Sequence, residues 1–209
     1  MTLDIHITSD FICPWCYVGE ARLQRAITEL GLDDQVNLIW HPFELNPDMP
    51  PEGMDRKVYR SLKFGSWSRS QAMDRQTVAA AANDGLDFDY GRIERTPNTF
   101  QAHRLSAFAA SHGLQTKAVT ATLTAYFRDG RDIGDRTVLV EIGRETGLPG
   151  DALDAFLQSD DGAADLRRTI DAASVRSVPT FVIGDTVVGG AQPVETFVRI
   201  LADAVKHAA

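Results

Sequence analysis

The chain has 209 residues, 44% of them hydrophobic, which is enough to build the core of one domain or of one domain with a large insertion. Its formal net charge of −8 favours neither nucleic acid nor an anionic membrane surface as a partner. Residues 1–6 lack the basic and apolar segments of a secretory signal, and no apolar run approaches the roughly 18 residues of a membrane span. We therefore expect a cytoplasmic protein.

The first 45 residues predict a β-α-β unit. Residues 3–8 alternate apolar and polar side chains as a strand does, a helical pattern runs from Pro14 to Gly31, and a second strand follows at 36–40. A crossover connection of this length favours parallel pairing of the two strands.

The next strand signals lie near the other end of the chain. Residues 180–183 and 186–188 flank a Gly184-Asp185 turn and predict a β-hairpin, and a helix is expected from Pro193 onward. Between these ends the pattern is helical, with helices expected near 53–63, 68–83, 98–111, 116–128, 136–146, 149–158 and 160–173. The sequence thus predicts an α/β unit made of residues 1–45 and 173–209, interrupted by a helical insertion at 46–172.

The only two cysteines, Cys13 and Cys16, lie where the first strand gives way to the first helix. A helix N-terminus favours the thiolate form of Cys13, and Pro14 suits the first helical turn. Cys16 follows one turn later, close enough to attack a mixed disulfide on Cys13. A bridge closing so short a loop is a weak structural staple, so chemistry explains the pair better. Trp15 is expected at the surface, equally as a packing aromatic and as a substrate contact.

A metal site is the weaker interpretation of the two cysteines. Structural zinc usually takes four ligands, and the chain has neither a second CxxC nor a closely spaced histidine pair. Its histidines are scattered, at His6, His41, His103, His112 and His207. A redox pair without a metal is therefore favoured.

The run Val178-Pro179-Thr180 directly precedes the predicted hairpin and taken alone predicts a strand-entry turn. A strand leading to CxxC on a helix, followed far away by Val-Pro-Thr before a hairpin, resembles the thioredoxin superfamily. The helical insertion and the run Asp10-Phe-Ile-Cys-Pro-Trp-Cys-Tyr-Val-Gly19 are similar to the DsbA-like family, specifically its FrnE-type branch. Further similar runs are Pro42–Pro47, Arg95–Thr99, Ala102–Leu105, Gly130–Ile133 and Gly190–Pro193.

The resemblance implies a thioredoxin-like α/β fold with a large all-helical insertion. It also implies that Cys13 is the exposed attacking thiol and Cys16 the buried resolving thiol. Pro179 is then cis, and Val178 and Pro179 form a backbone edge that binds substrate beside Trp15. The implied activity is thiol-disulfide exchange with protein or small-molecule thiols and with a redox partner that the sequence does not identify. No cofactor is implied beyond the Cys13–Cys16 disulfide, and glutathione is a candidate co-substrate.

One position departs from the superfamily pattern. Many thioredoxin-like proteins carry a buried acid six residues before the first cysteine, where this chain has Ile7. Proton handling for Cys16 must then come from elsewhere, with Asp10, His6, Glu44 or water as candidates. An Asp10 carboxylate close to the thiol is expected to raise the pKa of that thiol, which opposes the effect of the helix terminus.

Polar residues of the insertion are candidates for lining the cleft in front of the cysteines. His103 is a candidate for proton handling or substrate contact, with a buried supporting position equally consistent. Asn98 is also a candidate for proton handling or for lining the cleft, although a helix cap is the favoured interpretation. Several residues fall around a predicted groove in the insertion, where a core role is favoured over substrate contact: Tyr59, Phe64, Trp67 and Met73.

Two other functions compete with thiol-disulfide exchange. A glutathione-dependent isomerase or transferase, of the kappa-class or 2-hydroxychromene-2-carboxylate isomerase type, shares the insertion architecture but usually has serine at the position of Cys13. A binding or chaperone-like module with incidental thiols is the third possibility. Retention of both cysteines favours the oxidoreductase.

Overall fold

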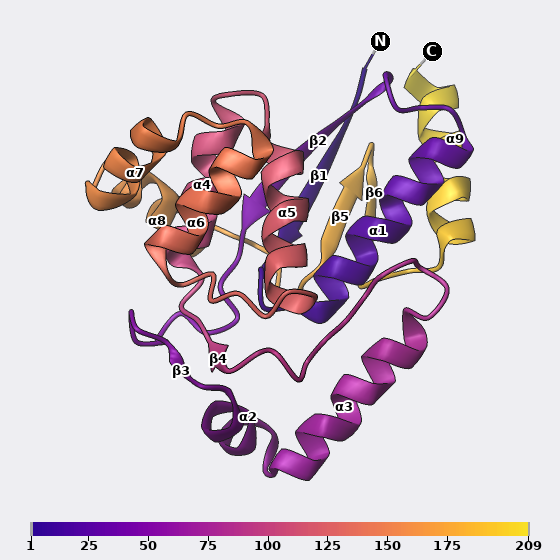
Figure 1. Cartoon of the computed structure of the whole chain (residues 1–209). Helices are drawn as coiled ribbons and strands as arrows, with labels where there is room; N and C mark the ends of the chain where they lie inside the picture. The colour runs from indigo at the N-terminus through magenta and orange to yellow at the C-terminus, as the bar shows by residue number, and fades with distance from the viewer. Residues whose placement is uncertain (1, 209) are drawn as a thin grey trace.

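A computed structural model describes residues 2–208. Its main sheet has the strand order β2-β1-β5-β6 (Figure 1). The strands are β1 (Leu3–Ser9), β2 (Val36–Pro42), β5 (Thr180–Ile183) and β6 (Thr186–Gly189). β1 pairs in parallel with β2 and antiparallel with β5, which forms the expected hairpin with β6. The α/β thioredoxin-like fold expected from the sequence is confirmed.

Two helices pack together beside this sheet. They are α1 (Pro14–Glu29) and α9 (Val194–Ala208), and α9 also contacts β1 and β5. The inward side chains of β1, Ile5 and Ile7, are fully buried against this layer, as the period-two pattern predicts. The two ends of the chain therefore form one unit, with a layer of two helices packed beside the sheet (Figure 1).

The region between β2 and β5 is helical, as expected. Its helices are α2 (Arg56–Phe64), α3 (Trp67–Ala80), α4 (Phe100–Ala110), α5 (Gln115–Phe127), α6 (Arg136–Thr146), α7 (Gly150–Gln158) and α8 (Ala163–Asp171). Helices α4 to α8 gather beside β2, whereas α2 and α3 lie apart at the bottom of the view (Figure 1). The boundaries at residues 45/46 and 172/173 remain a prediction.

One small sheet was not predicted. Strands β3 (Met54–Asp55) and β4 (Arg95–Thr96) pair antiparallel over two residues each. Two residues are too few for a period-two signal, and the expected helix at 53–63 begins only at Arg56. Asp55 is its N-cap, because the Asp55 carboxylate accepts a hydrogen bond from the Val58 N–H at 2.8 Å.

Candidate active site

The two cysteines lie at the N-terminus of α1. Cys13 is the N-cap residue in extended conformation, Pro14 begins the helix, and the Cys16 N–H donates to the Cys13 carbonyl at 3.0 Å. Both thiols are free, and Cys16 is 1% exposed. The expectation that Cys13 is exposed is wrong: its exposed fraction is 6%, because α2 and α3 enclose the space in front of it. Trp15 lies at the surface as expected, 39% exposed.

Val178 and Pro179 lie beside Cys13, although 165 residues separate Val178 from it in the chain. The Cys13 thiol donates to the Val178 carbonyl oxygen at 3.6 Å, and the Val178–Pro179 peptide bond is cis. The Pro179 carbonyl accepts from the Gly190 N–H at 2.8 Å. Gly19 of α1 faces this proline, and a Cβ there would lie 3.1 Å from Pro179 Cγ. A glycine at this position lets α1 approach the strand that carries Pro179.

The surroundings of Cys16 favour its protonated form. Burial is the main cause that raises the pKa of the Cys16 thiol well above its ordinary value, and the adjacent Cys13 raises it further. Hydrogen bonds from the Ser9 side chain and the Asp10 backbone act in the opposite direction on this pKa. Cys16 therefore needs a group that accepts its proton before it can act as a nucleophile.

A cluster of three titratable residues, Asp10, Glu44 and His103, is buried close to the cysteines. Asp10 is fully buried, and its Oδ2 accepts from the Leu45 N–H at 2.8 Å. Its Oδ1 has no hydrogen-bond partner among the described residues and lies 3.4 Å from His103 Nε2. His103 Nε2 also lies 3.0 Å from the Phe43 carbonyl oxygen. The structure thus brings together two of the three residues proposed for proton handling or the cleft, Asp10 and His103.

Glu44 completes this acid cluster. It forms an ion pair with Arg167 of α8, while its Oε1 lacks a partner within the described part of the chain. Burial raises the pKa of Glu44, against the lowering effects of Arg167 and His103. Two buried carboxylates therefore each present an unpaired oxygen beside one histidine.

A small cavity of ≈40 Å³ connects this region with Ser9, since Ser9 and His103 both line it. That space is large enough for a water molecule. Ser9 thus lies between the Cys16 thiol, to which it hydrogen-bonds, and a cavity that reaches His103.

Asn98 and His6 have other partners. Asn98 Oδ1 accepts from the Phe100 N–H at 2.9 Å at the start of α4, and its Nδ2 donates to the Met49 carbonyl at 2.7 Å. Thr99 is the N-cap residue of α4, so Asn98 stands one residue before the cap favoured from the sequence, although its side chain bonds the first N–H of the helix. His6 Nδ1 lies 2.9 Å from His41 Nε2, in a stacked pair.

A larger cavity of ≈290 Å³ lies in front of Cys13. Cys13 and Trp15 form one wall, α2 and α3 contribute the others, and Tyr126 of α5 also faces it. Three of the four residues expected around a groove line this cavity, namely Tyr59, Phe64 and Met73, whereas Trp67 lines a separate groove on the other side of α3.

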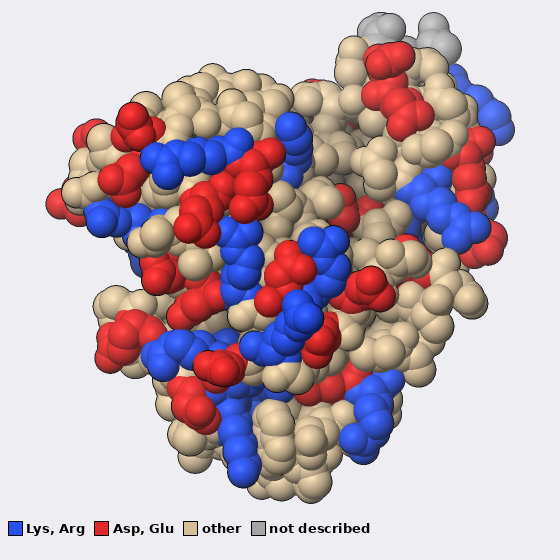
Figure 2. Space-filling view, viewed as in Figure 1, with Lys and Arg blue, Asp and Glu red and all other residues tan. Residues whose placement is uncertain are grey.

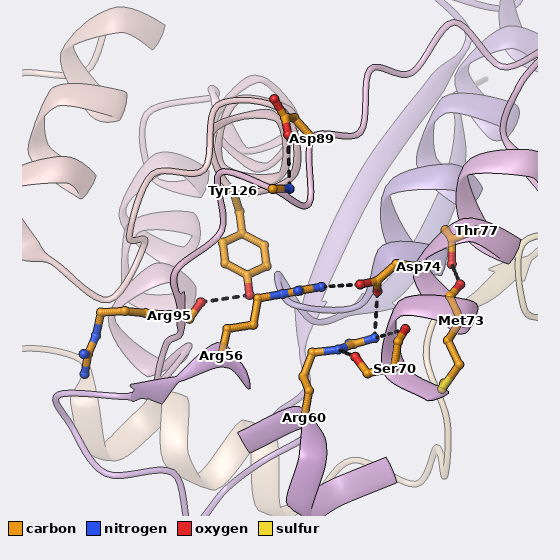
Figure 3. Close-up of polar contacts among 10 residues, drawn as sticks. Arg56, Arg60, Ser70, Met73, Asp74, Thr77, Asp89, Arg95 and Tyr126 are labelled. Atoms are coloured by element: carbon orange, nitrogen blue, oxygen red, sulfur yellow. Dashed lines mark hydrogen bonds and ion pairs between the residues drawn. The ribbon is translucent and has the colours of Figure 1, made fainter. Parts of the chain in front are cut away.

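Charged residues of this cavity were not identified from the sequence. Arg60, Lys63 and Asp74 line it, and Arg56 reaches the same carboxylate from α2. Arg56 and Arg60 converge on Asp74 of α3, with an N–O distance of 2.7 Å in each pair (Figure 3). The run Tyr59-Arg60 followed by Lys63-Phe64 marks one face of a helix, a signal that could have identified these residues.

Within residues 2–208 there is no group of three or more metal-ligating side chains, and no helix is long and apolar enough to span a membrane. A free thiol pair on a helix N-terminus, beside a proline that precedes an antiparallel strand, defines a thioredoxin-fold dithiol protein.

The comparison with known families agrees with this class. A DSBA-like thioredoxin domain matches residues 4–202, so the chain belongs to the DsbA-like family. YwbO of Bacillus subtilis, described as uncharacterized, is 32% identical over 211 residues, with 99% of both chains covered.

Solved structures show the same architecture. A probable DsbA oxidoreductase from Streptomyces coelicolor is 30% identical with a TM-score of 0.87, covering 98% of this chain and 90% of that one. The cytosolic disulfide reductase DsbM from Pseudomonas aeruginosa, solved with GSH, has a TM-score of 0.65 at 20% identity, covering 99% and 97%. At that identity DsbM shares the fold.

Proposed function

We propose that this DsbA-like protein is a thiol-disulfide oxidoreductase that uses Cys13 and Cys16 on protein or small-molecule thiols. The observation that carries the proposal is the pair at the α1 N-terminus, with the Cys13 thiol 3.6 Å from the Val178 carbonyl beside Pro179. Burial raises the pKa of the Cys16 thiol and so favours its protonated form until the resolving step.

In the reducing direction, the Cys13 thiolate attacks one sulfur of a substrate disulfide and displaces the other as a thiolate. Cys16 then loses its proton and attacks Cys13 sulfur, which releases the second substrate thiolate and forms the Cys13–Cys16 disulfide. Two electrons pass from the pair to the substrate, and the oxidising direction is the reverse. Trp15, Val178 and Pro179 are proposed to contact the substrate, with the Val178–Pro179 backbone as an edge for extended segments.

Proton handling is assigned in the same proposal to Asp10 and His103. The route runs from Cys16 through the Ser9 hydroxyl and the ≈40 Å³ cavity to His103 and Asp10. Asp10→Asn, which keeps the acceptor for the Leu45 N–H, should slow resolution of a mixed disulfide and shift its pH profile. His112→Gln, at an exposed histidine that follows the C-terminus of α4, is the control. An unchanged pH profile in Asp10→Asn contradicts this assignment.

Two features of the setting belong to the proposal as well. Glutathione is a candidate co-substrate and the cytoplasm the expected compartment, both in line with DsbM, a cytosolic disulfide reductase solved with GSH. An additional redox partner must recycle the pair, and its identity decides whether the protein works as oxidant or reductant. The reduction potential of the cysteine pair distinguishes an oxidant from a reductant.

Trapping tests the central claim. Cys16→Ser should accumulate mixed disulfides at Cys13, whereas Cys13→Ser should accumulate none, as read by non-reducing electrophoresis and mass spectrometry. Failure to trap any adduct counts against dithiol exchange. A glutathione-dependent isomerase needs no second cysteine, so full activity of Cys16→Ala would favour that alternative.

A further inference from the structure

The cavity in front of Cys13 restricts what can reach the thiol. Its volume of ≈290 Å³ is just below the roughly 300–1,000 Å³ typical of small-molecule sites. Residues of α2 and α3 cover Cys13, whose exposed fraction is 6%. Val178 and Pro179 are not among the residues that line this space. A bulky folded surface cannot enter it without displacing α2 and α3.

The cavity carries excess positive charge. Asp74 is its only carboxylate, and Arg60 and Arg56 each bind one of its two oxygens. Lys63 has no ion-pair partner among the described residues. Its ammonium instead donates to Asn46 Oδ1 and lies 5.3 Å from the Tyr59 ring centroid. Lys63 is therefore a cation available to a bound anion.

This local charge runs against the charge of the whole chain, which is −8. Lys and Arg are interspersed with Asp and Glu over the face shown in Figure 2, whereas the cavity is lined by two cations, Arg60 and Lys63, and one carboxylate. The remaining lining is apolar or aromatic, with Trp15, Phe64 and Tyr126 among its members. Aromatic faces pack against the hydrocarbon part of a ligand while a cation binds its charged end.

We propose that the preferred substrate of Cys13 is a small disulfide or thiol with a carboxylate a few bonds from the sulfur, bound by Lys63 and Arg60. The inference rests on the thiol-disulfide exchange proposed above and names its substrate class. The Cys13 thiolate attacks one sulfur, the departing half leaves as a carboxylate-bearing thiolate, and Cys16 releases the other half. Each turnover converts one disulfide into two thiols and oxidises the cysteine pair.

Three disulfides of nearly equal size separate charge from shape. They are 3,3′-dithiodipropionate, which is dianionic, bis(2-hydroxyethyl) disulfide, which is neutral, and cystamine, which is dicationic. The oxidation rate of the reduced full-length protein by each is divided by the rate of the same disulfide with 2-mercaptoethanol at the same pH. This division removes differences in leaving-group pKa.

The normalised rate should fall in the order dianionic, neutral, dicationic, with about fivefold between neighbours, and the spread should shrink as salt is added. Lys63→Gln should lower the dianionic rate about fivefold and leave the neutral rate unchanged. Lys57→Gln is the matched control, because Lys57 is an exposed lysine of the same helix that does not line the cavity.

Other results overturn the proposal in distinguishable ways. Equal normalised rates for the three disulfides, or equal effects of the Lys63 and Lys57 changes, remove the substrate class but leave the oxidoreductase standing. Faster reduction of insulin than of dithiodipropionate also removes it. If no disulfide oxidises the pair and Cys16→Ser traps nothing, the proposed function itself fails.

Discussion

The two sides of the cysteine pair differ in charge, burial and attachment. Behind the pair, Asp10, Glu44 and His103 are held in the body of the protein by loops after β1 and β2 and by α4. In front, Arg60 and Lys63 come from α2, which packs mainly on α3 and on the small β3–β4 sheet.

This difference separates two tasks within one site. A buried acidic cluster suits proton transfer from a buried thiol, because its groups are shielded from bulk solvent. A cationic cavity closed by a lightly attached helical pair suits ligand entry. Arg22 of α1 binds the C-terminal end of α3, because it donates to the Ala80 carbonyl at 2.7 Å and to Asp84. It also donates to the Ala191 carbonyl at 2.9 Å.

The largest effect is expected behind the pair. Asp10→Ala removes a charge-assisted hydrogen bond and leaves the Leu45 N–H without its acceptor, so the free energy of unfolding should fall by about 3 kcal/mol. Urea denaturation measures the loss. Asp10→Asn keeps an acceptor and should lose much less. Equal losses in both variants would show that the charge, and not the acceptor, stabilises the loop.

In front of the pair, Asp74→Asn should open the structure locally. The change leaves the buried Arg56 without its carboxylate, at a cost of about 3 kcal/mol if the helices stay in place. Separation of α2 from α3 exposes Arg56 to water and avoids that cost, so hydrogen exchange should rise across residues 56–80. Alkylation of Cys13 should accelerate about tenfold. Asp171→Asn, at an exposed site of α8, is the control. Loss of global stability without local opening would contradict a weak attachment of α2 and α3.

Much of the α/β unit with the cysteine pair could be predicted from the sequence, because the signals for its helices and strands are local. CxxC with Pro14 identifies a helix start, and Val-Pro-Thr before a hairpin identifies its partner strand. The exposure of Cys13 was mispredicted, because the position of α2 and α3 depends on ion pairs between separate helices, such as Arg56 with Asp74. The same holds for His103, whose contact with Asp10 depends on how α4 packs. For Asn98 the sequence indicated a role at the start of α4, because such a role depends on immediate neighbours, but the N-cap residue itself is Thr99.

A smaller effect should appear in the pH dependence of stability. Burial raises the pKa of Glu44 above its ordinary 4.5, so the folded protein holds this proton more tightly than the unfolded chain. The resulting stability is complete below pH 4.5 and is lost as the pH rises through the folded pKa. Relative to the parent protein, Glu44→Gln should therefore gain stability as the pH rises from 4.5 to 7.

Arg167→Gln provides the opposite test of the same group. Arg167 lowers the pKa of Glu44, so removing it should steepen the loss of stability with rising pH. Thermal unfolding of the three proteins across this pH range measures both slopes. Parallel curves would show that Glu44 does not titrate differently in the folded and unfolded states.

The smallest effect concerns Ser9, which joins the acid cluster to the resolving thiol. The Ser9 hydrogen bond lowers the pKa of Cys16, so Ser9→Ala should reduce its thiolate fraction and slow resolution about threefold. The attack of Cys13 on a disulfide should keep its rate, since only Cys16 loses a partner. Ser106→Ala, which alters the wall of the same ≈40 Å³ cavity, is the matched control. Stopped-flow tryptophan fluorescence resolves the two steps, and equal slowing of both would mean that Ser9 positions the helix start and does not assist the Cys16 proton.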